Sequence, residues 1–119
     1  MAETKNAIPK ELAERALHLM EKSRKSGKVK IGTNECTKHI ERGTAKLVLI
    51  AEDVNPKEVV MHLPLLCKEK KISYAFIPSK KELGERVGIG VGASAVVLLD
   101  EGDQKKELEE IVKRLREFQ

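Results

Sequence analysis

The chain has 119 residues, with 23 basic and 19 acidic side chains and a formal net charge of +4 at pH 7. This length fits a single domain, residues 1–119, and leaves no room for a second domain with its own core. No apolar run approaches the roughly 18 residues that a membrane span needs, which excludes a membrane-spanning protein. The first 20 residues scatter charges where a secretory signal needs an apolar stretch, so we expect a cytoplasmic protein.

The first half of the chain alternates helical and strand patterns. Residues 1–7 are expected to be a flexible tail. The elements predicted after it are an amphipathic helix from Pro9 to Ser26, a short strand at 29–31, a short helix at 34–42 and a strand at 47–51. Thr33 is expected to cap the short helix, and Gly43 stands where a terminating glycine belongs. The unbroken apolar run 47–51 is typical of a central strand covered on both faces.

The second half continues the alternation. The predicted elements are a helix from Pro56 carrying Val59, Val60, Leu63 and Leu66, a strand at 73–77, a helix capped by Ser79 and running to about Arg86, a strand at 94–99 and a terminal amphipathic helix from Asp103. Pro64 is expected to kink the first of these helices. Alternation with strands that are apolar on both faces predicts an α/β fold, a three-layer α-β-α sandwich with a mixed sheet of about four strands.

A glycine-rich loop, residues 88–93, matches the dinucleotide fingerprint G-x-G-x-x-A. The fingerprint binds pyrophosphate because it follows a strand and opens a helix. Here the loop follows a helix and precedes a strand, which argues against a nucleotide site. Val87, Ile89 and Val91 alternate with its glycines, and either they enter the core or they await a partner with an apolar face.

Other enzyme chemistry has little support in the sequence. Cys36 with His39, and His62 with Cys67, lack the spacing of known metal sites, so reduced core cysteines and surface histidines are expected. Ser94 lacks the second glycine of a nucleophile elbow. We therefore predict a protein that is not an enzyme and that has no metal or other cofactor.

Basic charge is concentrated in residues 22–46, which hold eight basic and two acidic side chains, a net charge of +6. Such a segment is the expected electrostatic footprint for a phosphate backbone, although a solvated surface remains the alternative. Lys28, Lys30 and Arg42 are expected to contact phosphates.

Within this segment, residues 32–38 (GTNECTK) are the most informative stretch. Ordinary helix chemistry accounts for Glu35 in the first turn and for a Glu35–Lys38 pair. It does not explain why an amide, Asn34, a carboxylate and an ammonium group gather at one helix end after a basic strand. Such a trio can donate to and accept from base edges, while backbone N–H groups bind phosphate.

Aromatic residues make up only 3% of the chain, so a sheet that stacks bases is not expected. The major groove of a regular A-form helix is too deep and narrow for side chains to read. A helix end that reads bases therefore indicates RNA with a bent or irregular helix.

These motifs, taken in order, resemble those of one known family. The residues that carry the resemblance are 32–38, Arg42-Gly43, the strand 47–51 followed by Glu52-Asp53, His62 to Cys67 (HLPLLC), and Pro78 to Gly84 (PSKKELG). Over residues 8 to about 118 the chain resembles the archaeal large-subunit ribosomal protein family called seven-Ae, whose members bind the kink-turn. The kink-turn is a helix–bulge–helix RNA element with tandem sheared G·A pairs.

The resemblance implies a role for each candidate residue. Asn34, Glu35 and Lys38 would contact guanine edges at the sheared pairs, next to Gly32 and Thr33, and Arg42 and Lys80 would contact backbone. Ile89, Gly90 and Val91 match the loop that meets the extruded bulge nucleotides. The sequence departs from the family pattern at Gly90, where an acidic residue is usual, and at Gly92.

The resemblance also implies the partners. We predict an RNA-binding protein, monomeric when free, that stabilises kink-turns in ribosomal RNA, in box C/D and H/ACA guide RNAs and in ribonuclease P RNA, and that nucleates assembly with other ribonucleoprotein proteins. The alternative is a structural ribosomal or protein-interaction member without kink-turn selectivity.

Overall fold

A computed structural model describes residues 8–118 and places four strands in one mixed sheet. The strands are β1 Lys28–Ile31, β2 Leu47–Ala51, β3 Tyr74–Ile77 and β4 Ala95–Asp100. Their spatial order is β1-β4-β2-β3, with β2 and β3 parallel and the other neighbours antiparallel. All five residues of β2 are buried, which confirms the central strand predicted from its unbroken apolar run.

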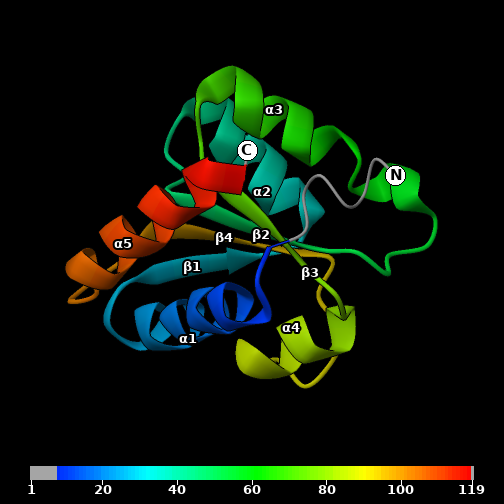
Figure 1. The fold of residues 1–119 in the computed structure, drawn as a ribbon. Coiled ribbons are helices and arrows are strands. Elements are labelled where there is room, and N and C mark those ends of the chain that lie inside the picture. The colour runs from blue at the N-terminus through cyan, green and yellow to red at the C-terminus, as the bar shows by residue number, and fades with distance from the viewer. Residues whose placement is uncertain (1–7, 119) are drawn as a thin grey trace.

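Helices cover both faces of this sheet, which confirms the α-β-α sandwich. Figure 1 shows α1 and α4 on one side and α2 and α3 on the other. The α-helices are α1 Lys10–Ser26, α2 Thr33–Arg42, α3 His62–Lys70, α4 Lys80–Arg86 and α5 Lys105–Leu115, with short 3-10 helices η2 at Lys57–Val59 and η3 at Arg116–Phe118. None of the helices within residues 8–118 is long and apolar enough to cross a membrane.

Ion pairs attach α4 and α5 to α1. Arg15 on α1 donates two hydrogen bonds of 3.0 Å to the Glu107 carboxylate of α5. Arg86, near the end of α4, lies 2.7 Å from carboxylate oxygens of both Glu14 and Glu21 on α1. The two carboxylates raise the pKa of Arg86 and Arg86 lowers theirs, so this cluster stays charged at neutral pH.

Two local predictions are wrong. Thr33 does not cap α2; Gly32 takes that position with φ +110°, and its carbonyl accepts from Cys36 N at 3.0 Å. Pro64 does not kink a helix, because η2 and α3 are separate and α3 begins only at His62. Pro64 therefore lies in the first turn, where a proline needs no N–H.

Candidate nucleic-acid interface

The first turn of α2 lies where the edge strand β1 meets the beginning of β4. Gly32 N donates to Ala95 O at 2.8 Å, which holds the end of β1 against β4 before the chain turns into the helix. The positive φ of Gly32 permits this turn, because residues with a Cβ rarely adopt that backbone conformation. The N–H groups of the first turn, which have no acceptor within the helix, therefore lie at the edge of the sheet.

Glu35 is the acidic member of the polar group on α2. Its carboxylate lies 3.4 Å from Lys38 Nζ and 3.6 Å from His39 Nε2. Burial, followed by the charge of Lys38, lowers the pKa of His39, so the imidazole is neutral at pH 7. Among residues 8–118, only Lys38 then balances the carboxylate directly, and Glu35, whose side chain is 37% exposed, remains able to accept hydrogen bonds.

Backbone hydrogen bonds of Lys80 hold this residue beside the glycine-rich loop. Ser79 caps α4 by accepting from Glu82 N, and Lys80 N donates to Asp53 Oδ1 at 2.8 Å. Ala93 N, at the end of the loop, donates to Lys80 O at 2.9 Å. These contacts bring the start of α4, the turn after β2 and the end of the loop together.

The loop closes against α4 because Gly84 has no side chain. A Cβ at Gly84 would lie 1.7 Å from Val91 O, and Ile89 N donates to Gly84 O at 3.1 Å. Val91 is 66% exposed, whereas Ile89 is half-buried and packs against the core. Of the two alternatives left open for the apolar residues of this loop, Val87 and Ile89 pack in or against the core, whereas Val91 is exposed.

A hydroxyl pair joins the loop to α2. Thr33 Oγ1 and Ser94 Oγ lie 2.8 Å apart, and Ser94 O accepts from Ala51 N at the end of β2. The Thr33 hydroxyl is therefore directed to Ser94, which leaves its backbone N–H as the group available to a ligand. The structure thus brings residues 32–38, Lys80 and the loop 88–93 to one end of the sheet.

Two cations of the basic segment 22–46, Lys46 and Arg24, bind groups of the protein itself. Lys46 Nζ lies 2.6 Å from Glu101 Oε1, and this hydrogen bond lowers the pKa of Glu101. The Arg24 guanidinium donates to Val87 O, where the glycine-rich loop begins. The net charge of the basic segment therefore overstates the positive charge offered to a ligand.

The remaining candidate cations, Lys28, Lys30 and Arg42, lie on β1 and at the end of α2, away from the first turn of α2. Arg42 ends α2, about 13 Å along the helix axis from Thr33. Lys28 and Arg42 both contribute to the lowered pKa of His39, which places them around the second half of α2. Lys28, Lys30 and Arg42 are exposed and form no ion pair among the described residues. They form a basic flank beside the group at the helix start.

Cys36, Cys67, His39 and His62 are all buried or half-buried. Cys36 and Cys67 are free and fully buried, and burial raises the pKa of both thiols, that of Cys67 to about 12. His39 and His62 are half-buried rather than on the surface, which corrects the prediction for these two. No group of three or more potential metal ligands occurs within residues 8–118.

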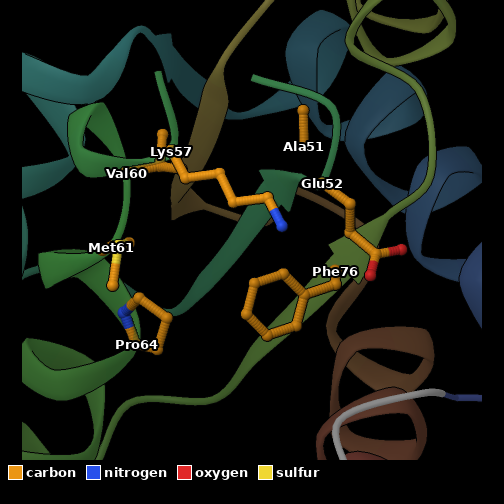
Figure 2. Close-up of a pocket in the computed structure, with 7 residues that line it drawn as sticks. All are labelled: Ala51, Glu52, Lys57, Val60, Met61, Pro64 and Phe76. Atoms are coloured by element: carbon orange, nitrogen blue, oxygen red, sulfur yellow. The ribbon is translucent and has the colours of Figure 1, made fainter. Parts of the chain in front are cut away.

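An apolar hollow adjoins this end of the sheet, and the sequence did not predict it. Its lining consists of Ala51, Glu52, Lys57, Val60, Met61, Pro64 and Phe76 (Figure 2). The Lys57 side chain extends across it. These residues come from three separate parts of the chain, 51–52, 57–64 and Phe76, so no single stretch of sequence has a pattern that marks the hollow.

Comparison with known proteins identifies a family and a similar solved structure. The family model described as the ribosomal protein L7Ae/L30e/S12e/Gadd45 family matches residues 14–108. The structure is similar to that of a Giardia lamblia 15.5kD RNA binding protein, with 33% sequence identity and a TM-score of 0.86. The match covers 94% of this chain and 93% of the other.

Proposed function

The chain belongs to the ribosomal protein L7Ae/L30e/S12e/Gadd45 family, and on this basis we propose that it is an RNA-binding protein that recognises kink-turns. One observation carries the proposal: a carboxylate, an amide and an ammonium group at the start of α2 lie at the same end of the sheet as Lys80 and the loop 88–93. The similarity to a solved RNA-binding protein supports an RNA partner.

Each group of the surface has a chemical task in this proposal. Glu35 accepts hydrogen bonds from guanine N–H groups that sheared G·A pairing leaves accessible, and Asn34 and Lys38 complete the base contacts. Lys28, Lys30, Arg42 and Lys80 neutralise phosphates. Exposed Val91 covers the face of an unstacked bulge nucleotide.

The biological role follows from the bent RNA. By holding the kink, the protein nucleates assembly of a ribonucleoprotein in the cytoplasm, on ribosomal RNA, a box C/D or H/ACA guide RNA, or ribonuclease P RNA. This is a binding function without a catalytic step. The family subgroup that we propose is the archaeal seven-Ae group.

Gel-shift titration with two RNAs tests the proposal. One RNA contains a kink-turn, and the other is identical except that its G·A pairs are made Watson–Crick. We expect the kink-turn to bind at least about tenfold tighter, because each lost base-edge pair is worth about 1–3 kcal/mol. Equal affinities would instead favour a structural or protein-interaction member without kink-turn selectivity.

A further inference from the structure

A series of hydrogen bonds connects the first turn of α2 to α3 on one side and to the start of β4 on the other. His62 Nε2, on the first residue of α3, lies 2.7 Å from Thr37 Oγ1. The Thr37 hydroxyl donates to Thr33 O at 2.9 Å, and Thr33 Oγ1 lies 2.8 Å from Ser94 Oγ. The series therefore runs from α3 through α2 to the start of β4.

The direction of these hydrogen bonds defines what His62 does. A threonine hydroxyl has one proton, and Thr37 donates that proton to Thr33 O. Towards His62 it can then only accept, so His62 Nε2 carries the proton and donates. The imidazole of His62 on α3 thus contacts α2 through a directed hydrogen bond, in addition to the apolar core that the two helices share.

Apolar packing alone leaves the rotation of α2 weakly determined. Only Cys36 and Ile40 of this ten-residue helix are buried, and they form one line four residues apart. Apolar contact is not directional, so the burial of these two residues fixes the rotation of the helix less closely than a hydrogen bond on its flank does. At about 100° per residue, Thr33 and Thr37 lie on the flank between the buried line and the side that carries Asn34 and Lys38. Hydrogen bonds on this flank set how far those side chains turn outward.

We propose that His62 is a positioning residue for RNA recognition, and that its hydrogen bond to Thr37 sets the rotation of α2 that presents Asn34, Glu35 and Lys38. The inference rests on the proposed function, since it assigns the selectivity of that surface to a residue that does not touch RNA. His62 then acts as a hydrogen-bond donor to α2, and not as a metal ligand or as a solvated surface histidine.

Binding experiments with four single variants, and with the double variant of His62→Leu and Thr37→Val, test this assignment. His62→Leu and Thr37→Val each remove the hydrogen bond, His62→Gln keeps an N–H at similar reach, and His18→Leu removes an exposed histidine of α1 as a control. Kd is measured for the kink-turn RNA and for its Watson–Crick counterpart over a range of salt concentrations.

We expect His62→Leu and Thr37→Val each to weaken kink-turn binding about threefold to tenfold, the range of one hydrogen bond, without changing the salt slope or the affinity for the Watson–Crick RNA. The double variant should be no weaker than Thr37→Val alone, because Thr37→Val already removes the hydrogen bond that His62→Leu removes. His62→Gln should restore binding, and His18→Leu should have no effect.

Hydrogen exchange of the free protein supplies a readout without RNA. Cys36 N donates to Gly32 O in the first turn, so its amide should lose protection in His62→Leu and regain it in His62→Gln. The proposal is overturned if His62→Leu keeps the wild-type ratio of the two Kd values, or if exchange of the Cys36 amide is unchanged. Equal binding of both RNAs by the wild type would instead overturn the proposed function, and exchange would still test the positioning of α2.

Discussion

Glu35 is a carboxylate in a surface whose other charged groups favour anions. Lys38 lies 3.4 Å from it, and the neighbouring His39 is neutral at pH 7 because burial lowers its pKa. A surface that bound only phosphate would gain affinity by losing this negative charge. The position of Glu35 is therefore informative about selectivity, since base edges with N–H donors are what a carboxylate binds.

Glu35→Ala should weaken kink-turn binding by about 1–3 kcal/mol and leave binding to plain duplex RNA unchanged or slightly tighter. Glu41→Ala, at an exposed position near the end of the same helix, is the matched control for the change in charge. Filter binding with both RNAs measures the difference. An equal loss on both RNAs would assign Glu35 to helix stability rather than to base recognition.

His39 makes stability depend on pH in a defined window. Burial lowers its pKa below the ordinary value of 6.5, so the unfolded chain binds the proton more tightly than the folded one. The contribution of neutral His39 is complete above pH 6.5 and is lost as the pH falls through the lowered pKa. The carboxylates with lowered pKa values, such as Glu101 and Glu107, lose their contributions only below 4.5.

The melting temperature of the wild type should therefore fall as the pH drops below about 6.5 through the lowered pKa of His39, and fall less in His39→Gln. Thermal unfolding followed by circular dichroism at several pH values measures this. His18→Gln, at an exposed position on α1, is the control. Parallel curves for the wild type and His39→Gln would show that another group titrates in this window.

At the scale of elements, the sequence predicts those helices and strands whose pattern of apolar or capping residues lies within the element itself. The stripe of α1, the buried run of β2 and the capping by Ser79 all appear in the structure. The helix predicted from Pro56 is divided, because apolar residues continue through 59–66 while the chain turns between η2 and α3. Spacing alone does not distinguish one long stripe from two short helices.

The candidate site follows the same rule. Residues 32–38 are adjacent in sequence, so their common position at a helix start could be predicted. The partner of Thr33 is Ser94, 61 residues away, and no local pattern identifies such a hydroxyl pair. The half-burial of Ile89 was likewise unpredictable, because it depends on how Gly84 lets the loop approach α4.

The loop offers a paired test of core and ligand contacts. Ile89→Ala should lower the melting temperature, because the half-buried side chain packs against the core. Val91→Ala should leave the melting temperature almost unchanged and raise the RNA dissociation rate, since Val91 is 66% exposed. Calorimetry and surface plasmon resonance measure the two effects. Similar effects of both substitutions on melting would place Val91 in the core as well.

Gly90 tests the backbone of the same loop. Its φ of +73° favours glycine, and a Cβ there would meet no atom within 4 Å. Gly90→Ala should therefore destabilise the loop by about 1–2 kcal/mol through backbone strain alone, and weaken RNA binding. Gly92→Ala is the comparison, because its φ lies outside the positive range and the nearest atoms to its Cβ, at 3.3 and 3.6 Å, belong to the flexible Lys80 side chain. Tighter binding by Gly90→Ala would mean that the bound loop has a negative φ at this position.

For the whole molecule, the distribution of counter-charges matters more than the net charge of +4. Glu101 neutralises Lys46, and Arg24 holds the start of the loop. Lys28, Lys30 and Arg42 are exposed and have no ion-pair partner in the described part of the chain. In the proposed complex, RNA bound at these three positions would release counterions, whereas Lys46 already has its counterion within the protein.

The salt dependence of RNA affinity separates these two classes of cation. Changing Lys28, Lys30 or Arg42 to Ala should weaken binding to every RNA and reduce the slope of log K against log salt by about one unit or less. Lys46→Ala removes the same formal charge and should leave the slope unchanged. The lost partner of Lys46 is the Glu101 carboxylate, so no contact with an RNA phosphate is lost. Titrations at four or more salt concentrations determine each slope. If all four variants keep the wild-type slope, the basic segment is a solvated surface; if Lys46→Ala lowers the slope as much as the others, its ion pair opens when RNA binds.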